Sequence, residues 1–277
     1  MQRRVLPALD KMTPNYFQSL KACAMTDLSQ AHLKQHFTSA KMFANTGNYP
    51  AKTPGTWSAI KPLDTLSYSN GTVTGKKHWI SGVAYCDWVV VPAQAPTGHV
   101  IVVIDKKYLT IEPVATMGME KTLTVHFTCD QAPATYLYLR NDPLSAPADR
   151  LNHLSFITIQ LGLSIAAYND IDLHTQSTTD FNYIKTKVKL DIETLNLLWN
   201  YELGRLDEPV DWNRSKLLYS FGKKTICAVA NLVTELTGSG LFQTESPAHQ
   251  RYKDLLIYTT HMRNVSTAAR DIDNWSF

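Results

Sequence analysis

The sequence predicts an α+β protein with short N-terminal helices, a central β-sandwich or barrel and a C-terminal four-helix bundle. Short strand-like runs separated by turn residues fill the middle of the chain, from residue 63 to about residue 139. After residue 149, long segments carry apolar residues three or four positions apart and are joined by short connections. A stretch with Pro, Ser and Ala, from Pro143 to Pro147, separates the two patterns.

The composition excludes several classes of function. A chain of 277 residues with 44% hydrophobic content can bury a full core. The net charge is only +3, and dispersed Lys and Arg give no nucleic-acid footprint. We find neither a membrane-spanning apolar run nor a secretory signal. The four cysteines lack the spacing of a metal site and fit a reducing cytoplasm, so we expect a cytoplasmic, metal-free protein.

The N-terminal segment, residues 1–62, is too small for an independent domain. Helical spacing predicts two helices in it, over Tyr16 to Ala24 and onward to Phe43, the second with Asp27 or Ser29 as its N-cap. Residues 46–62 are rich in Gly, Pro, Thr and Ser and predict a loop or linker. We expect Trp57 to anchor this loop to the body of the protein, and a role in binding is the alternative.

Residues 63–145 predict a β-domain. The expected strands are Leu66 to Ser69, Val73 to Trp79, Trp88 to Gln94, His99 to Ile104, Thr110 to Val114 and Val125 to Thr128. Asn70-Gly71 between the first two is a strong signal for a tight hairpin turn. Strands this short and this closely spaced favour a small sandwich or barrel.

Residues 146–277 predict the helical bundle. We expect Asp149 to cap a first helix, Asp180 and Asp211 to begin a second and a third, and Pro247 to lie in the first turn of a fourth. These helices are expected to end near Asp170, Gly204, Leu236 and Ala269. The second helix carries an apolar stripe that we expect to be core: Ile184, Val188, Ile192, Leu195 and Trp199.

The stretch from Gly71 to Gly82 carries the first candidate site. Where its strand ends, it places a Trp face for a flat ring, a Ser hydroxyl for a ring edge and a Gly that permits close backbone approach. These residues are Trp79, Ser81 and Gly82. The alternative is a β-hairpin whose Trp79 is part of the core, which is the more common fate of a tryptophan.

This stretch also resembles a known family. Gly75-x-Lys77-x-Trp79-Ile80-Ser81-Gly82, followed by Cys86-Asp87, is similar to the start of the middle β-domain of the acyl-CoA dehydrogenase superfamily. In that family the Trp-Ile-Ser/Thr element lies against the flavin ring, and its hydroxyl bonds the N5 edge. The resemblance implies FAD or FMN as cofactor. Lys77-His78-x-x-Ser81-Gly82 is closer to the flavin-dependent monooxygenase branch, which includes dibenzothiophene monooxygenase.

Further motifs follow in the order of the family. Thr116 to Thr124 resembles its G-x-x-x-T-x-S/T loop, which implies that Thr122 and Thr124 lie near the flavin or substrate; ordinary strand threonines are the alternative. Thr237 to Phe242 occupies the place of its Gly-Gly-x-Gly loop, implying cofactor contacts from Gly238 and Gly240. The segment from Gln250 to Asp254 resembles its Arg-x-x-Arg-Asp element.

Departures from the family pattern bear on the chemistry. Met262 stands where dehydrogenases commonly carry a Glu base, and a thioether cannot accept the substrate α-proton. His261 has the spacing from Asp254 of a monooxygenase His that assists an oxygenated flavin, and its pKa range suits proton delivery. The resemblance thus implies His261 and Ser81 as catalytic residues. A helix His bonded to a neighbour or to solvent is the alternative.

Other departures weaken the cofactor assignment. The family's Arg-x-x-Phe-Gly is absent, and Thr178 to Asn182 places an acid, Asp180, near the expected cation that would contact the diphosphate. Thr234 stands where a Gln usually precedes the glycine loop. Compared with typical domain sizes, the N-terminal helical part is shorter than in relatives by about 60 residues. In the family that part walls the flavin cavity.

Two functions therefore remain open. The first is a flavin-dependent oxidoreductase that acts on a small hydrophobic molecule or an acyl thioester, leaning toward monooxygenase chemistry with reduced flavin from a separate reductase. The second is a degenerate, non-catalytic scaffold that assembles with a complete partner subunit. An ordinary dehydrogenase with its base moved to Glu235 or Glu245 ranks below both.

The resemblance also implies a homodimer or homotetramer packed through the helical bundle. A stripe on the third bundle helix fits such an interface or packing within the chain: Ile226, Val229, Leu232 and Val233.

Overall fold

The computed structural model describes residues 13–116, 118–140, 142–143, 146–174, 179–237 and 247–261. The chain divides into two compact units, and each is considered by itself. The first is rich in strands and includes His32–Thr116 and Glu120–Asn152. The second is helical and includes Pro14–Ala31, Met117–Met119 and the chain from His153 onward.

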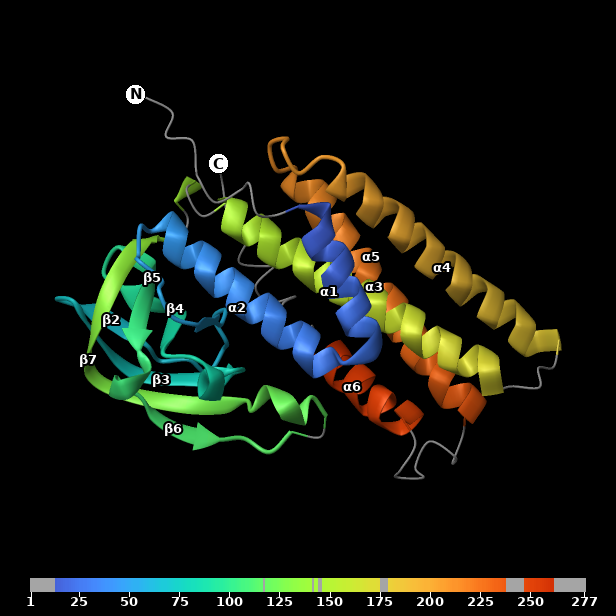
Figure 1. Cartoon of the computed structure of the whole chain (residues 1–277), viewed down its shortest axis with the longest axis horizontal. Coiled ribbons are helices and arrows are strands. Elements are labelled where there is room, and N and C mark those ends of the chain that lie inside the picture. Colours follow the sequence, from blue (N-terminus) through green and yellow to red (C-terminus); the bar gives the residue numbers. More distant parts are fainter. Residues whose placement is uncertain are drawn as a thin grey trace. The chain divides into compact units, whose positions relative to one another are not determined.

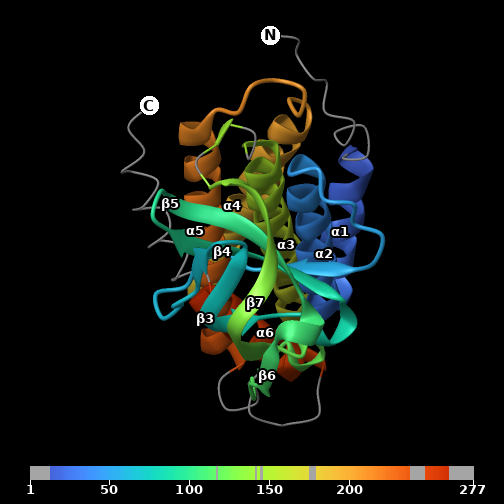
Figure 2. The same cartoon turned by 90° about the vertical axis from the view of Figure 1, so that its left-hand side faces the viewer.

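A closed barrel forms the first unit. Its strands are β1 (Gly55–Trp57), β2 (Ser67–Ser69), β3 (Thr72–Ile80), β4 (Trp88–Ala95), β5 (Gly98–Asp105), β6 (Thr110–Pro113) and β7 (Val125–Leu139). The strand order β4-β2-β3-β7-β5 closes on itself because β5 also pairs with β4. The strand β1 extends the sheet from β4, and β6 extends it from β7. Figure 2 shows β6 next to β7. The expected sandwich or barrel is therefore a barrel.

Local turn chemistry explains the first hairpin. Asn70 and Gly71 both have positive φ, 50° and 80°, and they join Ser69 directly to its cross-strand partner Thr72. Two consecutive left-handed residues match the twist of the flanking strands, so the predicted Asn-Gly turn is confirmed.

Aliphatic side chains from every long strand fill the barrel. Val89, Val91, Val102, Ile104 and Phe127 are fully buried members of this core. Val90 on the other face of β4 is buried as well, so Val89 to Val91 form a continuous buried run within the strand predicted from Trp88 to Gln94. A strand covered on both faces requires such a continuous apolar sequence.

The loop predicted over residues 46–62 contains a strand. Gly55 to Trp57 pair in parallel with Trp88 to Val90. Trp57 is buried and stacks on Phe43, with ring centroids 4.0 Å apart, so the expected anchoring role is confirmed. The glycines and prolines around this three-residue strand concealed it in the sequence.

The last strand is longer than predicted. Beyond Thr128, β7 continues to Leu139 and pairs with β3 and then with β5. Gln131 has a φ of 46° and Pro133 follows it, so alternation of apolar and polar residues is interrupted where the strand changes partner. This interruption hid the second half of the strand.

Six helices are described: α1 (Pro14–Thr26), α2 (Leu28–Thr46), α3 (Ala146–His174), α4 (Thr179–Leu203), α5 (Trp212–Thr237) and α6 (Pro247–His261). In the second unit, α3, α4 and α5 run side by side (Figure 1). The Trp199 indole of α4 donates to the Thr158 hydroxyl of α3 at 2.8 Å. A Cβ at Gly162 of α3 would approach the Lys21 carbonyl of α1 to 2.6 Å, so close packing of these helices requires the glycine.

Asp27 and Asp211, both expected at helix starts, act as N-caps. Asp27 accepts the amide of Gln30 and Asp211 that of Arg214, each at 3.1 Å. The expectation for Asp149 is wrong, because α3 already begins at Ala146. Asp149 instead lies in the first turn of α3, where the positive end of the helix dipole stabilises a carboxylate.

The apolar stripes pack inside the second unit. Along α4, Val188, Ile192, Leu195 and Trp199 are buried as expected, whereas Ile184 is 37% exposed. Along α5, Ile226, Val229, Leu232 and Val233 are all buried within the chain. The stripe of α5 is therefore core and offers no open face to a second subunit. Within the described residues, no helix combines the length and apolarity needed to span a membrane.

His153 makes the stability of the second unit sensitive to acid. Its Nδ1 is 2.7 Å from the Ser215 hydroxyl and its ring stacks on Tyr219. Burial lowers the pKa of His153 from 6.5 to about 4. The unfolded chain therefore binds the proton first, so stability is complete above pH 6.5 and falls toward pH 4.

We expect this group to remove on the order of 3 kcal/mol from the unfolding free energy by pH 4. Urea unfolding followed by circular dichroism between pH 7 and pH 4 measures the loss. His153→Asn keeps a polar atom at the Nδ1 position and does not titrate, so its acid limb is expected to be flatter. An unchanged slope would contradict this assignment.

Candidate functional site

The candidate site lies in the first unit, where β3 ends and β7 begins. Lys77 pairs with Phe127 and Ile80 with Val125. Between these pairs, His78 and Trp79 on β3 both lie opposite His126 on β7. Two residues against one form a β-bulge, a device that redirects a side chain.

The bulge turns Trp79 outward. Its φ is 56°, in the left-handed region that bulky residues rarely adopt, and its side chain is 44% exposed. The interpretation of Trp79 as a core residue is therefore wrong. The structure presents an indole on the surface and holds it in a strained backbone conformation.

His126 contacts Trp79 in two ways. The Trp79 amide donates to Nδ1 of His126 at 3.2 Å. The two rings meet edge to face, with centroids 5.4 Å apart. The His78 ring lies 4.9 Å from the same imidazole. Sequence reasoning missed His126, because a single His within a strand gives no sign of which residue it will oppose.

Three hydroxyl groups form a chain that begins at Ser81, two residues after Trp79. Ser81 Oγ is 3.0 Å from Thr124 Oγ1, which is 2.9 Å from Thr122 Oγ1. Thr122 ends a 3-10 turn and Thr124 precedes β7, so neither is the ordinary strand threonine of the alternative interpretation. A hydroxyl both donates and accepts. When the bonds run from Thr122 toward Ser81, the Ser81 hydrogen can donate to an acceptor on a ligand.

Gly82 and Ile80 hold Ser81 in place. Gly82 has a φ of 81°, and its amide donates to the Thr122 carbonyl at 2.8 Å. A Cβ on Gly82 would come within 2.8 Å of the Phe37 ring of α2. Ile80 is fully buried in the barrel. The space beside Gly82, which we expected a ligand to approach, is thus occupied by the Phe37 side chain of the same unit.

A buried ion pair fixes β3 just before the bulge. Lys77 is fully buried, and its Nζ lies 2.6 Å from Oδ2 of Asp64. The same carboxylate accepts the amide of Lys61 at 2.7 Å and the amide of His78 at 2.8 Å. Burial lowers the pKa of Lys77, and the Asp64 carboxylate opposes that shift. Asp64 therefore connects the preceding loop to the strand that carries Trp79.

An apolar pocket of about 650 Å³ opens beside Thr124. Its walls come from β6, the 3-10 turn and the start of β7: Ile111, Pro113, Val114, Ala115, Leu123 and Val125. Lys106 and Glu120 supply the charges at this pocket. Because Thr124 belongs both to the pocket and to the hydroxyl chain, an apolar ligand here would contact the polar group that bonds Ser81.

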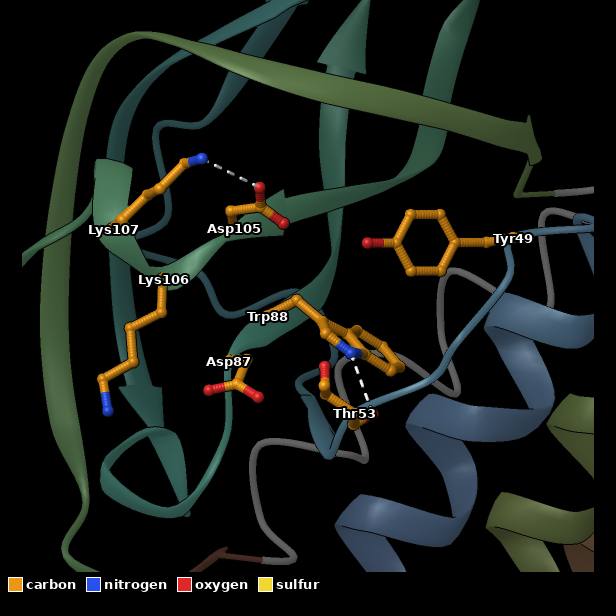
Figure 3. Close-up of a pocket in the computed structure, with 7 residues that line it drawn as sticks. All are labelled: Tyr49, Thr53, Asp87, Trp88, Asp105, Lys106 and Lys107. Carbon is orange, nitrogen blue, oxygen red and sulfur yellow. Dashed lines mark hydrogen bonds and ion pairs between the residues drawn. The ribbon is translucent and has the colours of Figure 1, made fainter.

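A second pocket, of about 620 Å³, has a different character (Figure 3). Lys107 extends toward Asp105, with 3.8 Å between Nζ and Oδ2 (Figure 3). The Trp88 indole donates to the Thr53 carbonyl at 3.0 Å. Asp87, which belongs to the resemblance, lines this pocket, whereas Trp79, Ser81, Thr122 and Thr124 do not.

The remaining expected site residues belong to the helical unit. Gly238, Gly240 and Met262 lie outside the described residues. His261 ends α6, and its side chain also lies outside the described part. Asp254 of α6 accepts the amide of Met119, also in this unit, at 2.9 Å. No metal-binding cluster of His, Cys, Asp or Glu occurs in the parts of the chain described above.

Solved structures share this fold. Glutaryl-coenzyme A dehydrogenase matches with a TM-score of 0.75 and 14% identity, over 87% of this chain and 74% of that chain. Butyryl-CoA dehydrogenase from Megasphaera elsdenii matches with a TM-score of 0.74 and 12% identity, over 88% and 76%. Dibenzothiophene monooxygenase from Paenibacillus sp. A11-2 matches with a TM-score of 0.64 and 16% identity, over 95% and 82%.

That monooxygenase has also been solved with FMN and indole. No protein-family model and no curated protein matches the sequence. At such low identities the structural likeness establishes the fold, and the chemistry has to be argued from the residues of this chain.

Replacing Lys77 by Met tests the buried ion pair. The change leaves the Asp64 carboxylate buried without its cation, so we expect a loss of about 3–5 kcal/mol from the unfolding free energy of the first unit. Urea unfolding measures it. Lys76→Met is the matched control, because Lys76 forms only an exposed pair with Glu112 and should change stability by less than about 0.5 kcal/mol.

Adding Asp64→Asn to Lys77→Met should recover part of the loss. The amide oxygen still accepts a backbone N–H, and the unpaired charge is removed. Equal stability of Lys77→Met and Lys76→Met would show that the pair does not fix β3.

Proposed function

We propose that this chain, which has the acyl-CoA dehydrogenase fold, is a flavin-dependent oxidoreductase acting on a small hydrophobic molecule or an acyl thioester. The observation that carries the proposal is the exposed Trp79 indole, which is followed two residues later by Ser81 and its chain of hydroxyls to Thr122. A flat ring whose edge bears hydrogen-bond acceptors is the ligand that such a surface suits.

Two features of the described residues support a flavin as the ligand. The bulge exposes Trp79 at 44%, which leaves an aromatic surface against which a ring can stack. Ser81 can direct a hydroxyl hydrogen at the ring edge through its bond to Thr124. FAD and FMN share the same ring, so these contacts serve either cofactor. When bound, the flavin supplies the redox chemistry.

We infer that the reaction is closer to monooxygenation than to α,β-dehydrogenation. Met262 stands in the place of the dehydrogenase base and cannot remove the substrate α-proton. His261, which ends α6, carries a group that can hold and deliver a proton near neutral pH. We assign it that role together with Ser81. Thr122, Thr124, Gly238 and Gly240 complete the proposed cofactor site.

The apolar pocket beside Thr124 supports the choice of substrate class. Aliphatic side chains form most of its walls, and its volume of about 650 Å³ suits a small organic molecule. A reduced-flavin supply from a separate reductase and assembly into a homodimer or homotetramer are part of the proposal, in a cytoplasmic setting. The α5 stripe is buried, so an interface would use other residues.

A second candidate is a non-catalytic scaffold that assembles with a complete partner subunit. Met262 in place of the base and Asp180 near the expected diphosphate-binding cation favour it. The two candidates make opposite predictions: the enzyme binds flavin against Trp79, and the non-catalytic scaffold does not bind it.

Titration of the purified protein with FAD, FMN and their reduced forms tests the proposal, with visible absorption and flavin fluorescence as readouts. We expect stoichiometric binding by the wild type. Trp79→Ala should weaken it by about ten- to a hundredfold, the usual contribution of one stacked ring.

Tyr136→Ala is the matched control, since Tyr136 is 45% exposed on β7 and should leave affinity unchanged. A folded wild-type protein that binds none of these flavins would favour the scaffold.

Turnover tests the assignment of His261. With reduced FMN, oxygen and indole as the probe substrate, His261→Ala should lower product formation by about a hundredfold, the usual contribution of a positioned proton donor. His249→Ala on the same helix is the control. Product formed at the wild-type rate by His261→Ala would remove His261 from the mechanism.

A further inference from the structure

We propose that His126 is a positioning residue whose neutral imidazole holds Trp79 in the ring-presenting conformation and whose protonation releases it. The inference deepens the proposed function, because it names a proton-linked control of the same site. It rests on the geometry of the bulge, which exists whether or not a flavin binds.

The bulge needs an acceptor at this place. Trp79 has a φ of 56°, which costs a bulky residue roughly 1–3 kcal/mol and persists only when its surroundings enforce it. Its amide points away from the regular ladder because the pairing skips from Lys77 to Ile80. Nδ1 of His126, at 3.2 Å, accepts that amide. The imidazole thus replaces the carbonyl that a regular strand would have supplied.

Only the neutral imidazole can do this. An acceptor Nδ1 carries a lone pair, so the ring hydrogen is on Nε2. Protonation places a hydrogen on Nδ1 that faces the Trp79 N–H, and two donors cannot bond. The strained backbone then loses the partner that holds it, and the indole is free to leave its edge-to-face position on the imidazole.

The charges around His126 set when this happens. From β3 it faces Lys76 and His78, from β6 it faces its cross-strand partner Glu112, and from the loop before β2 it faces Asp64. Burial lowers the pKa of His126 below 6.5, with His78 and Lys76 adding to the effect and the two carboxylates opposing it. The imidazole is therefore neutral at pH 7, and release occurs on the acid side of 6.5.

Selective ¹⁵N-tryptophan labelling reports the bond directly. The chain has six tryptophans, and Trp79→Phe removes one backbone amide signal and one indole signal; the backbone signal that disappears is that of Trp79. In the wild type, we expect this amide resonance to move from a bonded to an unbonded position as pH falls, with a midpoint below 6.5.

Three variants separate positioning from mere folding. His126→Asn places an amide oxygen where Nδ1 lies, so the resonance should stay in the bonded position at every pH. His126→Leu should hold it in the unbonded position throughout. His78→Asn should preserve the titration. A wild-type resonance that does not respond to pH, or one that titrates equally in His126→Asn, would overturn the proposal.

FMN fluorescence titration provides the link to function. Affinity should fall about tenfold in His126→Leu at pH 7, the effect of one lost hydrogen bond, and about tenfold in the wild type upon acidification. His126→Asn should bind equally across the range. If neither the wild type nor any variant binds flavin, the proposed function fails, and the amide titration still decides the role of His126. If flavin binds with the same affinity in all of them, His126 does not position the ring platform.

Discussion

The position of Trp79 depends on the bonds made by the carboxylate of Asp64. It bonds the Lys77 ammonium and the amides of Lys61 and His78, and thereby joins a loop to the strand that carries Trp79. A charge in the barrel wall is tolerated only with a partner of opposite sign, so loop and strand keep one register. That register places two residues of β3 opposite His126, and the exposed indole is a consequence.

The sequence predicted the parts of the fold that depend on local chemistry. The Asn70-Gly71 turn, the caps at Asp27 and Asp211 and the buried run of β4 follow from residue types at fixed spacing. The strand β1 and the second half of β7 were missed, since their partners lie far along the chain. Family resemblance, rather than spacing, indicated that Ser81 and Thr124 belong to one site, and the structure brings their hydroxyls together.

The bulge could not be predicted from the sequence because the residues opposite it lie far along the chain. A run that alternates through Trp79 predicts a regular strand with a buried tryptophan, and nothing local to it reveals a missing partner. Asp64 and His126 looked like an ordinary loop acid and an ordinary strand residue. Their importance comes from what lies opposite them: a backbone amide that the ladder leaves unpaired is the feature that both residues serve.

The closure of the barrel has a consequence for how the protein behaves in a crowded solution. Because β5 pairs with both β4 and β7, the terminal strands of the described sheet are β1 and β6, which have three and four residues. An open edge presents unpaired backbone N–H and C=O groups to which another chain can add a strand, and a short edge offers few of them. The first unit should therefore resist edge-to-edge aggregation.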